Sequence, residues 1–312
     1  MRLLQFWTAH RGELASLLLQ HAALVVISTT AAIIVGIPAG VLAARRPRSG
    51  RWMVAIVNVA QTIPSLALLG FLLPLPFVGG LGSRTALMTL SIYALLPILR
   101  TTMAGLQQVD RAVIEAGVAM GMTDRQLLWL VELPLALPSI VGGIRVATVI
   151  GVATATIAAA IGAGGLGEYI FRGLSMTDTT TILAGAVPAA ALALAADALL
   201  GKLGRRLAQA RMASGVALKT VGVAIIVLSA ASGIAYARAG STSVVVGSKN
   251  FTEQVILGEL VSQTLEAEGL TVDRRLNLGG TFICDRALRS GDLDVYVEYT
   301  GTAVTAVFHQ DV

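Results

Sequence analysis

The sequence predicts an all-α polytopic membrane domain followed by a partial α/β lobe. Of its 312 residues, 55% are hydrophobic and only 13% are charged, and the mean hydropathy is +0.78. Uncharged runs of about 20 residues recur, which is the length that a helix needs to cross the hydrocarbon core of a bilayer. From Ser243 onward the composition changes to that of a soluble domain with alternating strand and helix patterns.

Six apolar segments are expected to span the membrane as helices. The first 21 residues precede them and are expected to form an interfacial helix, with Trp7 at the level of the lipid headgroups. Residues 22–212 then form the core of the membrane domain, and residues 213–240 hold the sixth span and a linker. The expected spans are Ala22–Ala44, Met53–Leu73, Thr85–Leu106, Pro138–Ile161, Thr180–Leu200 and Val216–Tyr236.

Two basic clusters set the expected orientation of these spans. One follows the first span and the other follows the fifth: Arg45, Arg46, Arg48 and Arg51, then Lys202, Arg205, Arg206 and Arg211. Cytoplasmic loops of membrane proteins are enriched in Lys and Arg, so both clusters are expected in the cytoplasm. Alternation of the spans then puts the N-terminus and the C-terminal lobe outside. The formal net charge of +5 therefore reports membrane topology rather than a nucleic-acid partner.

Two charged residues, Arg145 and Asp197, fall inside expected spans but near their cytoplasmic ends. A charge within a span is a candidate for function, but these positions favour an ion pair or packing. The glycine-rich segment Gly162–Gly167 superficially resembles a phosphate-binding loop. It follows a membrane span rather than a strand, and no Lys-Ser/Thr pair follows it, so we interpret it as a tight external turn.

The chain holds few of the residues that catalysis or metal binding requires. Its single cysteine, Cys284, excludes an internal disulfide framework, and its three histidines lie far apart in the sequence. The sequence contains no G-x-x-x-x-G-K-[ST] pattern, so an ATPase site is not expected in this polypeptide. We expect that the chain catalyses no bond chemistry and binds no metal or cofactor.

The longest polar interruption of the membrane domain lies at about residues 110–134. It predicts two short helices separated at Gly121, where a residue without a Cβ reverses the chain. Thr123 or Asp124 is expected to cap the second helix, and Pro134 is expected to end it. The first helix has one apolar and one charged face, which is typical of a helix gripped by a partner or of an ordinary helix between two spans.

The spacing of this segment resembles the EAA loop of ABC-importer permeases. Six residues carry the match, and Gly117 replaces the family's second alanine: Glu115, Ala116, Gly117, Gly121, Leu133 and Pro134. The resemblance implies a coupling helix that docks into a groove on a separate ATP-binding subunit, which holds the ATP and Mg²⁺. It also implies a multi-pass protein of the bacterial plasma membrane that works as a homodimer, in which ATP hydrolysis by the partner subunits drives the spans between inward- and outward-open states.

The soluble tail, residues 243–312, has the alternating pattern of a parallel α/β lobe. VVVGS at residues 244–248 predicts a buried strand, and an amphipathic helix is expected over Phe251–Glu268, ending at Gly269. This helix is expected to turn five apolar side chains inward: Val255, Ile256, Leu260, Val261 and Leu265. A second strand, a second helix and a third strand are expected at Thr271–Leu276, Thr281–Arg289 and Asp294–Tyr299.

Three segments of the tail, GSKNFTEQ, LGGT and YVEYTGT, resemble the solute-binding domains of osmoprotectant importers. The resemblance implies quaternary amine ligands such as glycine betaine, choline and carnitine. A trimethylammonium group has no proton to donate, so aromatic faces bind it by cation–π attraction, whereas a carboxylate needs a cation and hydroxyl groups. By this resemblance Tyr299 forms one wall of an aromatic cage, and Lys249 and Thr302 contact the polar end of the ligand. The alternative is that Lys249 simply follows a strand at the surface.

The family pattern leaves several alternatives open. Family members bind ligand between two lobes, whereas this sequence ends at Val312 after one lobe, so either it is truncated or another polypeptide supplies the rest. The tail alone is then expected to bind no betaine tightly. The sixth span with Ala237-Arg238-Ala239 resembles an internal signal peptide, although an uncut anchor is preferred. Alternative substrates are ergothioneine and other amino-acid-like solutes, and from a different class the chain is a membrane-anchored ligand sensor.

Overall fold

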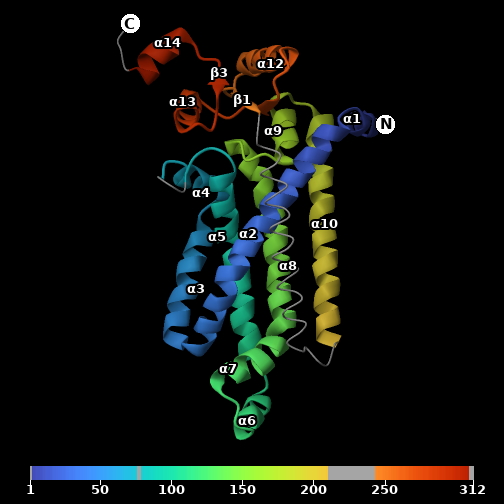
Figure 1. The fold of residues 1–312 in the computed structure, drawn as a ribbon, viewed down its shortest axis with the longest axis vertical. Helices are drawn as coiled ribbons and strands as arrows, with labels where there is room; N and C mark the ends of the chain where they lie inside the picture. The colour runs from blue at the N-terminus through green and yellow to red at the C-terminus, as the bar shows by residue number, and fades with distance from the viewer. Residues whose placement is uncertain (1, 76–78, 210–242, 309–312) are drawn as a thin grey trace.

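The structure is a computed structural model that describes residues 2–75, 79–209 and 243–308. Long helices run side by side along one axis, with a small α/β lobe at one end and a pair of short helices at the other (Figure 1). The lobe end comprises the lobe and the segments 79–82 and 162–178. The coupling end comprises residues 108–132.

The bundle contains helices α1 (Arg2–Ala9), α2 (Arg11–Arg45), α3 (Pro47–Thr62), α4 (Ser65–Leu72), α5 (Ser83–Gln107), α6 (Arg111–Ala119), α7 (Asp124–Leu127), the π-helical turn η1 (Leu128–Glu132), α8 (Leu133–Ala158), the 3₁₀ turn η2 (Ala159–Ile161), α9 (Gly167–Ser175) and α10 (Thr179–Gln209). The lobe contains β1 (Val244–Gly247), α12 (Thr252–Ala267), β2 (Val272–Arg275), α13 (Thr281–Ser290), β3 (Val295–Tyr296), α14 (Thr300–Thr302) and the π-helical turn η3 (Ala303–Val307).

Among the described residues, four helices are long and apolar enough to cross a membrane, and a fifth candidate is the bent pair of α3 and α4. These elements match the first five expected spans. The sixth expected span, Val216–Tyr236, and the Ala237–Ala239 segment lie outside the described residues.

The second expected span, Met53–Leu73, is bent rather than straight. α3 and α4 meet at an angle of 96°. The bend lies at Ile63 and Pro64, both of which have extended ψ angles, 126° and 138°. A residue before proline avoids the helical region, and proline cannot donate the hydrogen bond that would continue α3. The sequence therefore encodes the bend locally.

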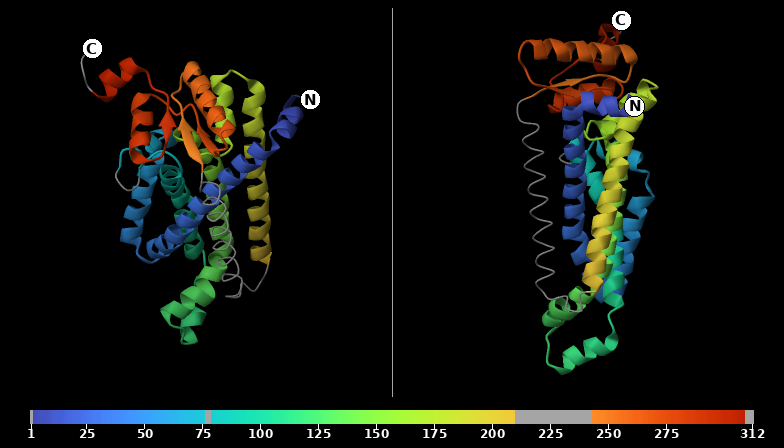
Figure 2. Two further views of the ribbon diagram at one scale, coloured as in Figure 1. Left: turned by 45° about the horizontal axis from the view of Figure 1, so that its top comes forward. Right: turned by 90° about the vertical axis from the view of Figure 1, so that its right-hand side faces the viewer.

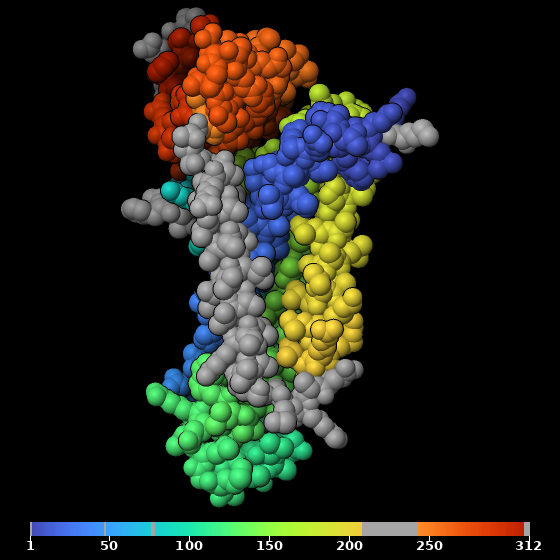
Figure 3. All heavy atoms as spheres, turned by 45° about the vertical axis from the view of Figure 1, so that its right-hand side comes forward, coloured from blue at the N-terminus to red at the C-terminus, as the bar shows by residue number. Residues whose placement is uncertain are grey.

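The N-terminal segment packs on the bundle. α2 begins at Arg11, within the segment expected to be interfacial, and α1 precedes it. The indole nitrogen of Trp7, expected at headgroup level, donates to the carbonyl of Ala184 in α10 at 3.3 Å. Phe6 packs edge-on against the ring of Tyr169 in α9, with ring centroids 5.5 Å apart. α1 is thereby attached to the lobe end of the bundle (Figure 3).

Small residues bring the long helices into close contact. A Cβ on Gly40 of α2 would lie 2.6 Å from Thr102 of α5, and one on Gly143 of α8 would lie 1.8 Å from the hydroxyl of Thr101. Neither position tolerates a side chain, and such contacts are typical of helix pairs inside membranes. Gly143 therefore lets α8 pack closely against α5.

Arg145 and Asp197 form an ion pair that joins α8 to α10. The guanidinium donates from Nε to one carboxylate oxygen at 2.5 Å and from Nη2 to the other at 2.6 Å. This two-point geometry is the strong form of the arginine–carboxylate pair. Of the two predicted alternatives, an ion pair or packing, the structure shows the ion pair.

The lobe contains a three-stranded parallel sheet with strand order β2-β1-β3. The two crossovers contain α12 and α13, so the predicted parallel βαβαβ order is confirmed. Figure 2 shows the lobe from two further sides, above the ends of the long helices. The GAGGLG segment and the lobe therefore lie at the same end of the bundle.

The inward face of α12 differs from the prediction. Ile256 and Leu260 are 57% and 56% exposed, so the expectation that they point inward is wrong. The buried stripe is Gln254, Gly258 and Ser262 at four-residue spacing. A Cβ on Gly258 would lie 2.8 Å from a methyl carbon of Leu276, so small residues let α12 lie close to the sheet.

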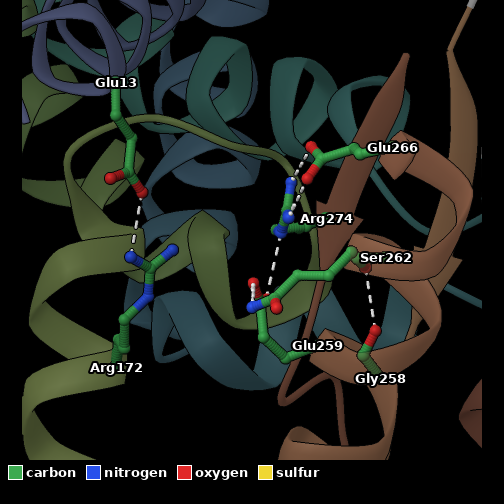
Figure 4. Close-up of polar contacts among 8 residues, drawn as sticks. Glu13, Arg172, Gly258, Glu259, Ser262, Glu266 and Arg274 are labelled. Atoms are coloured by element: carbon green, nitrogen blue, oxygen red, sulfur yellow. Dashed lines mark hydrogen bonds and ion pairs between the residues drawn. The ribbon is translucent and has the colours of Figure 1, made fainter. Parts of the chain in front are cut away.

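Ion pairs join β2 to α12 within the lobe, and α9 to α2 within the bundle (Figure 4). Arg274 of β2 donates to Glu259 at 3.0 Å and to both carboxylate oxygens of Glu266 at 2.6 and 2.7 Å, which joins the strand to α12. Arg172 of α9 donates to Glu13 of α2 at 2.9 Å. The second pair fixes α9 beside the start of α2 at the lobe end.

Candidate functional sites at the two ends

The coupling end has the predicted break between two short helices. Asp110 accepts a hydrogen bond from the backbone N–H of Ala112 at 2.9 Å and so caps α6. Gly121 follows α6 with φ of +81°, a conformation that glycine adopts without strain. Thr123, rather than Asp124, caps α7: its hydroxyl accepts from the N–H of Gln126, whose side chain accepts from the N–H of Thr123.

The predicted coupling residues divide into exposed and buried groups. Glu115 is exposed and forms an ion pair with Arg111 at 3.3 Å, and Ala116 is also exposed. Gly117 is buried, and a Cβ there would lie 2.7 Å from a methyl carbon of Leu127. Glycine at 117 therefore lets α6 close onto α7, which gives a physical reason for the departure from alanine.

Leu133 and Pro134 are buried at the start of α8, and Pro134 does not end a helix. Helical structure continues from Asp124 to Ile161, so that expectation is wrong. Proline fits the first turn of α8 because backbone N–H groups there are not needed for intrahelical bonds. The π-helical turn Leu128–Glu132 comes directly before it and replaces the usual four-residue spacing of the backbone hydrogen bonds with a five-residue spacing.

Exposed apolar side chains gather on α6 and at its end. Val113, Val118 and Met120 are all exposed, and Met120 is 72% exposed. Arg45, from the first basic cluster, pairs with Glu132 at 3.0 Å and donates to the carbonyl of Asp124, which fixes α7 to the end of α2. An exposed apolar patch on a braced loop is typical of a protein contact site.

The lobe brings Lys249 and Tyr299 together at the carboxyl ends of β1 and β3. This edge of a parallel sheet is where α/β domains bind ligands. Lys249 is 1% exposed, so the alternative of a surface lysine is wrong. Its ammonium group lies 4.4 Å from the centroid of the Tyr299 ring and 6.0 Å from that of Phe251. The Tyr299 ring thus already faces a cation.

Polar groups complete the surroundings of the Lys249 ammonium. It donates to the carboxylate of Glu298 and approaches the hydroxyl of Thr281 at 3.5 Å. Burial opposes ionisation of Glu298, but the hydrogen bonds from Lys249 and from the N–H of Tyr299 keep the pKa of this carboxyl below its ordinary value. The pair is therefore charged and buried.

Tyr299 is held at its hydroxyl and is partly exposed. The hydroxyl donates to Glu253 of α12 at 2.6 Å, and this bond keeps the pKa of Glu253 below its ordinary value. The residue is 39% exposed. Thr302, on α14, follows Tyr299 by three positions and is half-buried.

Four residues around this site were not assigned from the sequence: Phe251, Glu253, Thr281 and Glu298. All four belong to the segments GSKNFTEQ, LGGT and YVEYTGT that carry the family resemblance. These residues come together because the ends of β1 and β3 are neighbours in the sheet, and a local sequence pattern does not predict strand order. The acidic residue at position 298, next to Tyr299 in a strand segment, was the available signal.

Comparisons with known proteins match both parts of the chain. The profile of the family described as "Binding-protein-dependent transport system inner membrane component" matches residues 36–209. The profile described as "Substrate binding domain of ABC-type glycine betaine transport system" matches residues 242–312.

Curated relatives match the permease part of the chain, and one of them is a fusion of a permease with a binding protein. The Bacillus subtilis glycine betaine/carnitine/choline transport system permease protein OpuCD is 43% identical over 211 residues, which cover 67% of this chain and 91% of that protein. The Listeria monocytogenes carnitine transport permease protein OpuCD is 49% identical over 177 residues, covering 56% and 78%. The Helicobacter pylori ergothioneine transport permease/ergothioneine binding protein EgtU is 36% identical over 282 residues, covering 87% of this chain and 50% of that protein.

A solved structure agrees with the helix arrangement. An inward-facing structure of the MetNI methionine ABC transporter matches 64% of this chain and 98% of its own chain, with a TM-score of 0.59 and 26% identity. The bundle therefore has the type I ABC-importer permease fold. The chain belongs to the family of binding-protein-dependent transport system inner membrane components, with a substrate-binding domain of the glycine betaine type fused behind the permease.

Proposed function

We propose that this chain is the permease subunit of an ATP-driven importer of quaternary ammonium compounds of the glycine betaine, choline and carnitine class. The fused lobe receives the substrate, and the helix bundle carries it across the membrane. The observation that carries the substrate class is the ring of Tyr299 facing the Lys249 ammonium at 4.4 Å. A ring that accepts an ammonium on its face has the chemistry to accept a trimethylammonium group.

Lys249 and Thr302 then contact the polar end of the substrate, and Tyr299 forms one wall of its cage. Lys249 exchanges its carboxylate partner from Glu298 to the ligand when a betaine binds. The tail alone binds no betaine tightly. The described lobe offers two aromatic faces, those of Tyr299 and Phe251, and two faces do not enclose a trimethylammonium group. Equilibrium dialysis with residues 243–312 that found micromolar affinity would contradict this.

ATP hydrolysis belongs to a separate subunit that docks on residues 110–134. The exposed apolar patch around Met120 and the exposed Glu115 provide its contact surface. Two copies of the chain form a homodimer around one pathway, and two ATPase subunits drive it. Because Arg45 of the first basic cluster is bound at the coupling end, that end faces the cytoplasm, and α1 and the lobe lie outside. The sixth span that the sequence predicts, Val216–Tyr236, lies outside the described residues and stays a prediction.

The decisive experiment is uptake by the full chain with its ATP-binding subunit in proteoliposomes. Labelled choline, carnitine and glycine betaine are supplied on the lobe side and ATP on the coupling side. We expect accumulation that needs hydrolysable ATP and is competed by unlabelled quaternary amines. The absence of uptake, together with the absence of any ATP-binding subunit that co-purifies with the chain, would leave the sensor hypothesis as the better one.

A second candidate substrate is ergothioneine, itself a trimethylammonium betaine. The fusion protein EgtU, named for ergothioneine, aligns with 87% of this chain through both permease and binding lobe. Competition with ergothioneine in the same uptake assay separates the two. If ergothioneine inhibits uptake at lower concentration than choline, carnitine and glycine betaine, the substrate assignment changes while the transport mechanism stands.

A further inference from the structure

A third charged side chain, Arg100 of α5, lies within the first five expected spans, and its charge is not balanced there. The other two charges, Arg145 and Asp197, bind each other at two points. Residues 47–107, which include both α5 and its neighbour α3, contain no Asp or Glu (Figure 1). Arg100 is exposed, and it forms no ion pair with any described residue. A charge inside a span is a candidate for function, and this one lacks the structural explanation that Asp197 gives to Arg145.

The guanidinium of Arg100 is held deep in the bundle. Its Nη2 donates to Oδ1 of Asn58 in α3 at 3.0 Å, which is its one side-chain hydrogen bond among the described residues. Asn58 follows Pro47, where α3 begins at the coupling end, by eleven positions, which correspond to about 16 Å of helix. A long basic side chain that needs only water reaches for the nearer membrane interface instead. The remaining N–H groups of the guanidinium can therefore serve another partner.

The break between α3 and α4 adds exposed backbone to the same face of α3. Asn58 and Gln61 are three positions apart and so lie on one side of the helix. The side-chain amide of Gln61 donates to the carbonyl of Tyr93 at 2.6 Å, and the hydroxyl of Tyr93 donates to the carbonyl of Ile63 at the break. Ile63 itself is 38% exposed. Exposed non-helical backbone within a membrane occurs where it lines a water-filled space rather than lipid.

The opposite face of α3 is apolar. Trp52, Ile56 and Val59 are exposed and recur at the spacing of one helix face. This face suits lipid, whereas the face with Asn58 and Gln61 suits water. The two faces of α3 therefore separate the hydrocarbon from a polar surface that α3 and α5 share.

We propose that Arg100 contacts the substrate during its passage through the bundle, where it binds the carboxylate of a betaine such as carnitine or glycine betaine. A guanidinium donates two parallel hydrogen bonds to a carboxylate, and Arg100 has donors to spare beyond the one that Asn58 accepts. Choline carries a hydroxyl in place of the carboxylate, so its passage does not depend on this contact. The inference rests on the proposed function and gives the bundle, as well as the lobe, a part in selecting among quaternary amines.

Uptake by the full chain with its ATP-binding subunit in proteoliposomes tests this selection. Arg100→Gln removes the charge, and we expect the ratio of carnitine uptake to choline uptake to fall about tenfold, because only carnitine loses a partner. Arg100→Lys keeps the cation and is expected to recover part of the ratio. Arg84→Gln is the matched control, since it makes the same substitution at an exposed position in the first turn of α5, at the lobe end, and is expected to leave the ratio unchanged.

Two results of this assay would overturn the proposal. One is an unchanged ratio in Arg100→Gln. The other is an equal fall in the uptake of carnitine, glycine betaine and choline, because that is what the loss of a structural contact or of a bound lipid phosphate produces.

Thiol labelling tests the position of this face without transport. Asn58→Cys and Ile56→Cys, on opposite faces of α3, are treated in the full chain in membranes with a membrane-impermeant methanethiosulfonate. We expect labelling at least about tenfold faster at Asn58→Cys, because ionised thiols react in water and not in lipid. Carnitine is expected to slow it more than choline does at the same concentration. Equal labelling at the two positions, or none at Asn58→Cys, would overturn the assignment of this face to the pathway.

The unmodified chain is the unreactive control for labelling. Its native Cys284 is buried, and burial raises the pKa of that thiol to about 11. The labelling rates need neither ATP nor uptake. A chain that takes up none of the three compounds would contradict the proposed function, whereas the labelling rates decide separately whether water reaches the face that carries Arg100.

Discussion

The two ends of the helix bundle differ in how their contact groups are used within the chain. At the lobe end, the Lys249 ammonium occupies the face of Tyr299, and the lobe covers the loops at Gly80–Gly82 and Gly162–Ala163. At the coupling end, the side chains of Val113, Val118 and Met120 are exposed. A fused partner leaves its contacts buried, whereas a separate partner leaves them exposed until it binds. The difference indicates which partner this polypeptide carries and which it recruits.

The largest expected effect is a loss of stability at the lobe end. Lys249→Met leaves the Glu298 carboxylate buried without its cation, and removing one member of a buried pair destabilises a fold by roughly 3 kcal/mol. Hydrogen exchange of the β1 amides in the full chain measures the loss. The double variant with Glu298→Gln removes both charges and is expected to recover most of it. Equal losses in the single and double variants would show that the charge pair is not the cause.

At the coupling end the expected effect is on transport. Gly117→Val places carbon atoms where Leu127 lies, so α6 separates from α7 and the contact surface is lost. We expect uptake to fall by about tenfold or more, with weaker retention of the ATP-binding subunit. Gly142→Ala is the matched control, because a Cβ on Gly142 has no atom within 4 Å. Normal uptake by Gly117→Val would disprove that this packing supports coupling.

A smaller effect sharpens the assignment of the cation-facing ring. Tyr299→Leu removes the aromatic face and is expected to raise the choline concentration for half-maximal uptake by about fivefold, equivalent to ~1 kcal/mol. Tyr299→Phe keeps the ring and loses only the hydrogen bond to Glu253, so its effect is smaller. If the phenylalanine and leucine variants behaved alike, the hydroxyl rather than the ring would be the important group.

The smallest effect concerns Glu168 of α9, at the lobe end. Burial, together with the nearby carboxylates of Asp273 and Glu13 and against the attraction of Arg172, raises its pKa from 4.5 to about 7. The folded state then holds a proton that the unfolded chain releases above pH 4.5. The resulting penalty is absent below pH 4.5, grows as the pH rises to 7, and is complete above it.

The lobe end is therefore expected to be less stable at pH 8 than at pH 5 by about 1 kcal/mol, since partial solvent access reduces the full linkage energy. Thermal unfolding of the full chain at the two pH values measures the difference. Glu168→Gln is expected to abolish this part of the pH dependence. An unchanged pH dependence in that variant would assign it to other groups.

Features that depend on local pattern were predictable. The first five spans follow from uncharged runs, the break at Gly121 from its lack of a Cβ, and a cap at Thr123 or Asp124 from their short polar side chains, of which the structure uses Thr123. The parallel order of the lobe follows from alternating strand and helix patterns. Each of these rests on residues close together in the sequence.

Features that depend on tertiary contacts were not. Pro134 lies in an unbroken helix because a π-helical turn precedes it, and Lys249 is buried because Glu298 reaches it from another strand. Ile256 and Leu260 face outward because Gly258 brings α12 close to the sheet. In each case a neighbour distant in sequence, or a change in helix type, overrides the local preference.

The helical run from Asp124 to Ile161 has a mechanical consequence. Its 38 residues correspond to about 57 Å, and they connect the capped turn at Thr123 to the loop at Gly162. A displacement of one end of this helical run is transmitted to the other end. The π-helical turn at Leu128–Glu132 is its most flexible part. The ATP-binding partner and the substrate-binding lobe would then contact opposite ends of the same helical run.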